Sequence, residues 1–432
     1  MKCKALSFSL PSIRSFLLSA FVFLGPLGNL LTPHFVSSPF RFYYFLLSFF
    51  PLFYPLAYFK EFKSLLIVFP FLFYCLLSAF FTRFADLPLE AQPFFRFFLL
   101  GSQCLFAFGA AMHLRESNLL YEKSRLIKLY LFSFFLSLLV GYIFYIGFYL
   151  GKVSFATITR FSVLTQIGYS ILRFSPGSYP NEYGNVSSFV LSILTFLIVG
   201  KKEIPLPHFF SRKLLYIAFF FTFLALLLTT TRAAYLSYFF SCSYLLIISF
   251  GMRKALIKMA IALGAFLLCL EFFYSKMLLA FLSVLQALTD KLGSMSTRLN
   301  TWTAGAEQFI DSPLFGNGFG FHYRIHNVYL QFLFELGVIG AFLLLFTLLC
   351  SLASHQRSLS SLFFRRHMAC EDLFTNRVIV IGLIHVFWFA LTNHNLNHHL
   401  TWFIFLLMNM HLFSRKGIEK SEETSCLALG LK

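Results

Sequence analysis

Charged residues are scarce in this sequence, and acidic residues are the scarcest of them. Only 12% of the 432 residues are charged, with 17 acidic against 35 basic side chains. Soluble domains carry about a quarter charged residues, whereas here 58% of the residues are hydrophobic. The composition therefore excludes a soluble globular protein and indicates a chain that sits in a lipid bilayer.

Carboxylates are also nearly absent from the apolar runs of the chain. Only Glu271 and Glu335 come close, and both lie near the end of a run. Ion-coupled transporters usually carry ionisable residues in the middle of the membrane. The sequence therefore argues against a secondary transporter, although it does not argue against a lipid flippase.

What the chain does have is a series of apolar runs long enough to cross a bilayer as helices. The fold class that they predict is all-α, a polytopic membrane protein of about 12 transmembrane helices. A β-barrel would show short alternating segments instead. The expected spans are 15–31, 42–59, 64–82, 96–113, 129–150, 186–200, 214–230, 234–251, 255–273, 328–350, 378–393 and 399–414.

Basic residues set the orientation of these spans, because cytoplasmic loops are enriched in lysine and arginine. With the N-terminus inside, the inner segments hold about two thirds of the 35 basic residues. We therefore predict cytoplasmic N and C termini, one transmembrane domain over residues 1–414 and a cytoplasmic tail at 415–432. The net charge of +18 is then a topology signal and not a nucleic-acid-binding surface.

A polar, glycine-rich stretch interrupts this pattern in the large outer loop at 274–327, between spans nine and ten. Ser296 or Thr297 is a suitable N-cap for a helix through Ile310, because apolar residues follow at helical spacing. The proline in Asp311–Pro313 ends that helix. A membrane protein that keeps such a segment at one face is expected to use it for chemistry or for ligand binding.

Two arginines are predicted at the same outer face. Arg232 follows three threonines at the tight turn between spans seven and eight, and Arg298 opens the helix of the large loop. The planar guanidinium matches phosphate oxygens, and a low dielectric strengthens the contact, so the pair predicts an anionic ligand. Each arginine also has a plainer interpretation. Arg232 could snorkel to the interface, and Arg298 could be a solvated residue at a helix start.

His326 is the candidate base at this face, where it is followed by Asn327 and span ten. A neutral imidazole can take a proton from a sugar hydroxyl near pH 7. The alternative is a hydrogen-bonded interface histidine. The preceding run Gly316–Gly320 lacks the spacing and the strand of a dinucleotide fingerprint. It predicts a sharp turn or a close approach of the backbone to a ligand.

A second group of histidines, His394, His398 and His399, lies between the last two spans. His394 and His398 are four residues apart and could share a helix face. No carboxylate or cysteine in this loop completes a metal site, so polar capping or a contribution to an outer cavity is favoured over a metal.

The outer-face segments resemble the O-antigen ligase and polymerase superfamily. The resemblance covers residues 177–345 and is carried by four fragments in order: GSYPNEYG, TTTRAAYL, STRLNTWTAGAEQFIDSPLFGNGFG and HNVYLQFLFELGVIGAF. In that pattern an arginine follows an outer turn, an arginine and a tryptophan lie in the large loop, and His-Asn is followed by Glu-x-Gly. Arg324 matches no element of the pattern.

The resemblance implies a GT-C-like glycosyltransferase that needs no nucleotide, no metal and no cofactor. Its donor would be a glycan on undecaprenyl diphosphate, used at the periplasmic face of the bacterial inner membrane. Arg232 and Arg298 would bind the donor diphosphate, and His326 would activate the acceptor hydroxyl for an inverting displacement. The supporting residues that the pattern implies are Asn181, Trp302, Gly316, Gly318, Asn327 and Glu335.

Among the functions that share this donor, the single large late loop favours an O-antigen ligase, whose acceptor is lipid A–core. An O-antigen polymerase or a protein O-oligosaccharyltransferase is the alternative, and these differ only in the acceptor. A polyprenyl-glycolipid flippase or transporter is the candidate from another class. It would be expected to show an inverted repeat between two halves, and the sequence shows none.

Overall fold

The protein, seen here in a computed structural model, is described over residues 10–27, 30, 62–82, 92–114, 119–155, 157–158, 173–176, 180–199, 211–261, 292–321, 325–354, 370–392 and 398–410. The labelled helices are α1 (Leu10–Leu27), α4 (Phe62–Phe81), α5 (Pro93–Leu114), α6 (Leu119–Tyr149), α8 (Pro180–Val199), α9 (Arg212–Thr229), α10 (Arg232–Phe250), α12 (Leu292–Asp311), α13 (Val328–Ser354) and α15 (Cys370–Ala390). Residues 252–261 and His399–Met410 are also helical.

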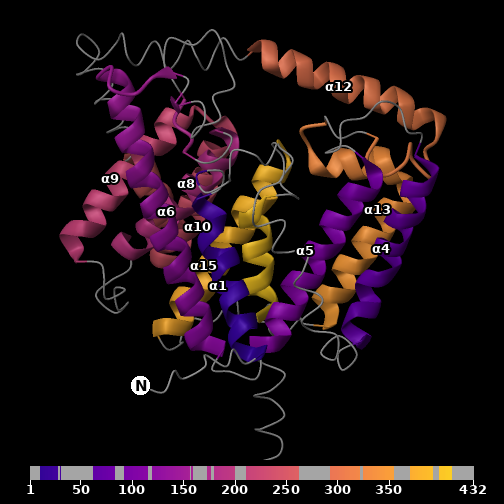
Figure 1. Cartoon of the computed structure of the whole chain (residues 1–432), viewed down its shortest axis with the longest axis horizontal. Helices are drawn as coiled ribbons and strands as arrows, with labels where there is room; N and C mark the ends of the chain where they lie inside the picture. The colour runs from indigo at the N-terminus through magenta and orange to yellow at the C-terminus, as the bar shows by residue number, and fades with distance from the viewer. Residues whose placement is uncertain are drawn as a thin grey trace, which may run out of the picture.

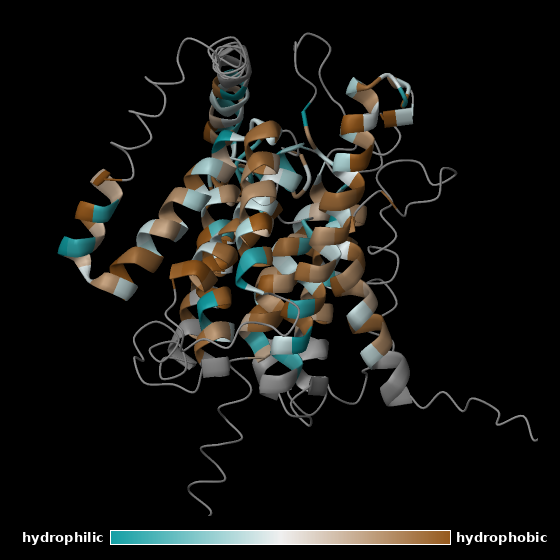
Figure 2. Cartoon of the chain, turned by 90° about the vertical axis from the view of Figure 1, so that its left-hand side faces the viewer, coloured by the Kyte–Doolittle hydropathy of each residue, from teal (hydrophilic) through white to brown (hydrophobic). Residues whose placement is uncertain are grey.

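These helices confirm a multi-pass, all-helical membrane protein. Within the described ranges, six of them are long and apolar enough to cross a membrane. Hydrophobic residues run along most of the length of the upright helices in Figure 2. Large apolar side chains stay exposed on them, such as Phe69, Phe80 and Phe220, as expected of helix surface that faces lipid rather than water.

Ten of the twelve predicted spans correspond to helices of the structure. The span at 42–59 lies outside the described residues, and only 252–261 of the region around 255–273 is described. Four helices, α1, α6, α8 and α15, begin at least five residues before the predicted span. Helix α6 begins at Leu119, where Glu122 and Arg125 form an ion pair of 2.9 Å one turn apart, and α8 begins at Pro180. Proline suits a first helical turn because an N–H at that position would have no partner within the helix, so its absence costs nothing.

The helices form two packed groups. In one group α8 packs against α9, α10 and α15, and α6 packs against α1 and α15. In the other group α4 packs against α5 and α13, and α12 contacts α13. Figure 1 shows α12 lying across one end of the molecule, above α13 and α4. Helix α12 carries Arg298, one of the candidate site residues.

Candidate functional site

The turn between α9 and α10 carries Arg232. Helix α9 ends at Thr229, and Thr230 adopts a left-handed conformation with φ 50°, the only non-glycine residue with positive φ in the described part of the chain. Its N–H donates to the Leu227 carbonyl. Thr231 precedes α10, so the half-buried Arg232 is the first residue of that helix. A β-branched residue rarely adopts this conformation, so the surroundings must hold the turn in place.

Arg173 supplies much of that support, and sequence reasoning missed it. Its guanidinium donates to the Thr229 carbonyl at 2.8 Å, to Asn181 Oδ1 at 3.1 Å and to Thr231 Oγ1 at 3.2 Å. Asn181, predicted to precede a span, lies in the first turn of α8. In the sequence, Arg173 appeared only as one basic residue of an outer loop, and no spacing linked it to Arg232.

Helix α12 carries the second arginine. It begins at Leu292 and not at Ser296 or Thr297, so the predicted N-cap was wrong. Hydroxyl residues are tolerated inside a helix when they bond to the preceding turn, as Thr301 does to the Arg298 carbonyl. The predicted stop is confirmed, because the helix ends at Asp311.

Trp302 follows Arg298 by one turn of α12 and is half-buried. Its indole nitrogen is shielded from solvent and has no hydrogen-bond partner among the described residues. A side-chain atom added to Gly305 would lie 2.7 Å from the Phe334 ring. The absence of a side chain there lets α12 pack closely on α13.

The glycine-rich loop that follows α12 is joined to a break in α13. Gly337 has φ 66° and ψ −171°, which kinks α13 and removes two helical hydrogen bonds, those from residues 338 and 339 to residues 334 and 335. The loop replaces them. The Asn317 and Gly318 N–H groups donate to the carbonyls of residues 334 and 335, both at 2.9 Å. The N–H groups of residues 338 and 339 donate to the Pro313 and Leu314 carbonyls at 2.9 and 3.2 Å.

This exchange explains the glycines of the loop. A Cβ on Gly316, which has φ 72°, would lie 2.5 Å from the Glu335 carbonyl oxygen. A Cβ on Gly337 would collide with the Leu314 carbonyl, and one on Gly318 would collide with Thr82. The close approach predicted for these glycines is therefore an approach to the protein's own backbone and side chains.

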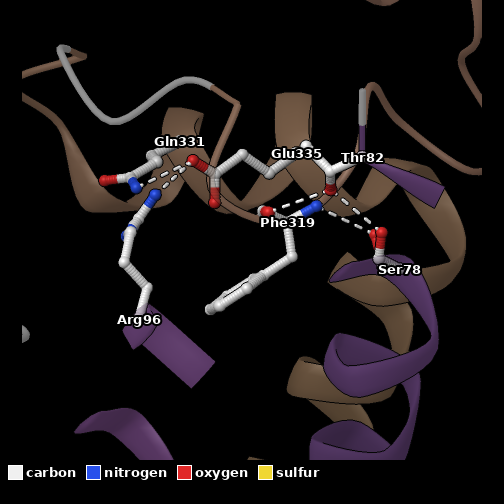
Figure 3. A network of polar contacts seen from close by, with 6 residues as sticks. All are labelled: Ser78, Thr82, Arg96, Phe319, Gln331 and Glu335. Atoms are coloured by element: carbon white, nitrogen blue, oxygen red, sulfur yellow. Dashed lines mark hydrogen bonds and ion pairs between the residues drawn. The ribbon is translucent and has the colours of Figure 1, made fainter. Parts of the chain in front are cut away.

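A buried ion pair lies beside this junction (Figure 3). Arg96 of α5 donates to Glu335 Oε1 at 2.9 Å, with the glutamate side chain fully buried and the arginine 11% exposed. Gln331 donates to the same oxygen at 3.0 Å. Glu335 therefore faces a cation and an amide within the protein and positions the loop junction. Like Arg173, Arg96 was not among the residues singled out in the sequence.

Helix α4 holds the loop from the other side (Figure 3). The Phe319 N–H donates to Ser78 Oγ, and the Phe319 carbonyl accepts from Thr82 Oγ1, both at 3.0 Å. The Arg96 guanidinium lies 5.3 Å from the centre of the Phe319 ring. The loop is thus fixed to α4, α5 and α13 together.

His326 directly precedes the cap of α13. Asn327 is buried, and its Oδ1 accepts from the backbone N–H groups of Tyr329 and Leu330 at 3.0 and 3.1 Å. The supporting role implied for Asn327 is therefore that of a helix N-cap. With Ile325 buried on one side and Asn327 on the other, the half-buried His326 has a fixed place in the chain.

Electrostatics link this histidine to both arginines. Burial lowers the pKa of the His326 imidazole below its ordinary value, and the charge of Arg298 lowers it further. Burial also lowers the pKa of Arg298, and the charge of Arg232 adds to the effect. Such an influence acts over short distances, so the fold brings the three residues near one another from α10, α12 and the start of α13. A neutral imidazole at neutral pH follows from the direction of the shift.

The family model described as O-antigen ligase matches residues 217–345 of the chain. Residues 217–345 are therefore similar to the O-antigen ligase family. The resemblance predicted from the sequence is thereby confirmed over these residues, whereas the fragment GSYPNEYG at 177–184 lies before them. The matched O-antigen ligase region contains Arg232, Arg298 and His326, whereas Arg96, Arg173 and Asn181 lie before it. No curated protein matches the chain.

The second group of histidines, His394, His398 and His399, lies outside the matched O-antigen ligase region. His399 is buried, with Nε2 3.1 Å from the Tyr130 hydroxyl, and its ring lies 4.4 Å from that of His398. No group of potential metal ligands occurs in the portion that the structure describes. Arg324 and His394 lie outside that portion. His398 and His399 therefore pack into the helical core.

Proposed function

We propose that this protein is an O-antigen ligase. It transfers a polysaccharide from undecaprenyl diphosphate to a sugar hydroxyl of lipid A–core at the periplasmic face of the bacterial inner membrane. The observation that carries the proposal is the electrostatic linkage of Arg232, Arg298 and His326, each half-buried and drawn from a different segment of a multi-pass membrane protein.

Arg232 and Arg298 bind the donor diphosphate. Two guanidinium groups near one another repel, as the lowered pKa of Arg298 indicates, and a bound dianion relieves that repulsion. Arg232 also stands at the N-terminal end of α10, where the helix dipole favours negative charge. In the reaction the same groups stabilise the negative charge that develops on the leaving diphosphate.

His326 acts as the general base. The acceptor oxygen forms a bond to the anomeric carbon of the donor while the bond from that carbon to the diphosphate oxygen breaks. The electron pair leaves with the diphosphate, and the acceptor proton passes to the imidazole. Displacement from the face opposite the leaving group inverts the anomeric configuration. No metal is required, because the arginines supply the charge stabilisation.

Donor binding also tunes the base. Without donor, the charge of Arg298 lowers the pKa of His326. A diphosphate on Arg298 offsets that charge, so the imidazole becomes a stronger base when the donor is bound. Proton removal from the acceptor is then favoured only in the loaded enzyme.

The same proposal covers the architecture. Residues 1–414 form a single GT-C-like transmembrane domain with N and C termini in the cytoplasm. Residues 177–345 form its core, and 415–432 form a cytoplasmic tail. The supporting roles of Trp302, Gly316 and Gly318 are to shape the large loop around the donor.

The test uses purified protein in detergent with an undecaprenyl-diphosphate glycan and rough lipopolysaccharide, in EDTA and without ATP. We expect wild type to attach the glycan to lipopolysaccharide, seen as a shift on a gel. His326→Ala, Arg232→Ala and Arg298→Ala should each lose transfer by about 100-fold or more. The matched control is Arg253→Ala, because Arg253 is an exposed arginine beyond the end of α10 that lies opposite to Arg232.

Other products would point elsewhere. A longer lipid-linked glycan with no attachment to lipopolysaccharide would show a polymerase, and glycosylated serine or threonine in an added protein would show a protein transferase. Movement of labelled lipid-linked glycan across vesicles without transfer would show a flippase. Full transfer by His326→Ala would remove the histidine from its role while leaving the ligase.

A further inference from the structure

Arg173 joins three segments around the turn that carries Arg232. It lies before α8 and is only 9% exposed. Its Nε donates to the Thr229 carbonyl at the end of α9, while its Nη2 donates to Asn181 Oδ1 of α8 and to Thr231 Oγ1 at the start of α10. The Thr231 hydroxyl donates in turn to the Pro180 carbonyl at 3.0 Å. One side chain thereby ties the ends of three helices together.

The segment that carries Arg173 is itself fixed. The Phe174 N–H donates to the Leu228 carbonyl at 3.0 Å. The Phe174 ring is buried against Tyr142 and Tyr183, with ring centroids 4.7 and 5.6 Å apart. The backbone next to Arg173 is therefore held by these contacts, so its guanidinium can restrain the turn.

The turn needs such support. Thr230 has a left-handed backbone with φ 50°, which a threonine adopts only when its surroundings impose it. Thr229 has a carbonyl near the end of a helix that cannot bond further along the helix, and Arg173 satisfies it. Gly184 of α8 adds close packing, because a Cβ there would lie 2.8 Å from Thr231.

We propose that Arg173 is a positioning residue for donor binding, which fixes the Thr229–Thr231 turn and so aims Arg232 at the donor diphosphate. The inference rests on the proposed function of Arg232. Arg173 acts through Arg232 and not on the phosphate, because it is buried and its Nε and Nη2 are engaged with protein oxygens.

An arginine suits this position for a geometric reason. The guanidinium fork donates in one plane to acceptors on different segments, whereas a lysine ammonium offers a compact charge on a flexible stem. Arg173→Lys keeps the charge and removes the geometry. It therefore separates positioning from a simple contribution of positive charge.

The experiment measures the Michaelis constants for donor and for acceptor with Arg173→Lys, alone and combined with Arg232→Gln. Arg377→Lys is the matched control, because Arg377 is also buried and its guanidinium donates to the Tyr244 hydroxyl away from the turn. Alone, Arg173→Lys should raise the donor KM by about 10- to 100-fold, as expected when a binding group is misplaced. The acceptor KM should stay unchanged. In the Arg232→Gln background, Arg173→Lys should add little.

An equal rise in both Michaelis constants, or a full added loss in the Arg232→Gln background, would overturn the proposal. Asn181→Ala removes only one of the acceptors and keeps the test usable if Arg173→Lys folds poorly. It should raise the donor KM in the same direction and should not add to Arg173→Lys.

Binding of undecaprenyl diphosphate to the purified protein separates this inference from the proposed function. If wild type binds the diphosphate but transfers no glycan, the ligase proposal fails. Arg173→Lys should still weaken the binding of undecaprenyl diphosphate more than the binding of undecaprenyl monophosphate. If wild type transfers glycan and Arg173→Lys binds donor as tightly as wild type, the positioning role fails and the ligase stands.

Discussion

The two ends of the candidate site are fixed by different means. On one side, the turn that carries Arg232 is held by side chains, with Arg173 and Thr231 bonded to the backbone and side-chain oxygens of neighbouring helices. On the other side, the loop that leads to His326 is held by its own backbone, which replaces the hydrogen bonds lost where α13 breaks at Gly337.

This difference predicts how each side fails. A side-chain support can be weakened one hydrogen bond at a time, so substitutions at the turn should act in graded steps. A backbone junction depends on the absence of side chains at Gly316 and Gly337, so a single added methyl group should disrupt it at once. The loop side also has side-chain contacts, namely the ion pair of Arg96 with Glu335 and the hydrogen bonds of Ser78 and Thr82 to Phe319.

The largest effect is expected from that ion pair. Glu335→Ala takes the carboxylate away from the buried Arg96 and should lower the free energy of unfolding by about 3–5 kcal/mol. Thermal unfolding in detergent measures it. Replacing both residues by leucine should cost less than the sum of the single changes, and Glu307→Ala on the exposed side of α12 is the control. A small loss in Glu335→Ala would show that the loop is held without the ion pair.

Gly316→Ala and Gly337→Ala come next. Each puts a Cβ against the backbone of the opposite segment at a residue with positive φ, and each should lower the free energy of unfolding by about 1–3 kcal/mol. Gly101→Ala in α5 is the control, since a Cβ there meets nothing within 4 Å; it should be neutral or stabilise by about 0.5–1 kcal/mol. Equal changes in the free energy of unfolding at all three positions would contradict the requirement for glycine at the junction.

On the turn side, Thr231→Val should lower the free energy of unfolding by about 1–3 kcal/mol, because it removes the hydroxyl that links Arg173 to the Pro180 carbonyl. Thr230→Gly should change it by less than about 1 kcal/mol, since glycine adopts φ 50° without strain but adds freedom to the unfolded chain. If Thr230→Gly proved the more harmful, the threonine side chain and not the backbone would be what the turn requires.

The smallest expected change is in the pH dependence. The lowered pKa of His326 places the acidic limb of the kcat/KM profile below the ordinary range of histidine. In Arg298→Gln the limb should move to higher pH, because one of the two causes is gone. In wild type the limb of kcat should lie at higher pH than that of kcat/KM, because bound diphosphate offsets Arg298. Identical acidic limbs in wild type and Arg298→Gln would show that the charge of Arg298 does not lower the pKa of His326.

The lowered pKa of His326 also makes the stability of the protein depend on pH. The unfolded chain binds a proton on His326 more readily than the folded protein does, because the folded-state pKa is the lower one. The contribution of this residue to stability is therefore present above the ordinary histidine pKa and is lost as the pH falls through the range between the two values.

The helical class was predictable from the sequence, and so was the proximity of Arg232, Arg298 and His326 that their electrostatic influence on one another indicates. Apolar run lengths reveal spans, and turn residues between spans reveal which side chains share a face. Arg173 and Arg96 could not be found in this way. Arg173 bonds to Thr229, 56 positions away, and Arg96 bonds to Glu335, 239 positions away, and only tertiary packing brings these residues together.

The roles of the glycines and of Glu335 were predictable only in part. The run Gly316–Gly320 signalled a close approach, but the sequence did not show that the approach is to α13. The start of α12 was predicted too late because serine and threonine mark a cap only when the helix does not continue through them. Those preferences act locally, and they do not prevent a helix from running through such residues, as α12 does from Leu292.

The junction at Gly337 also restricts chain length. Four backbone bonds connect residues 313–318 with residues 334–339 in a fixed register, so adding or deleting one residue inside either stretch would shift several bonds together. Stretches of this kind tolerate exchange of side chains that point away from the junction, such as the exposed Leu314 and Phe315, but not a change in the number of residues. Among related sequences, gaps should therefore be absent between Pro313 and Gly318, whatever residues occupy the positions between them.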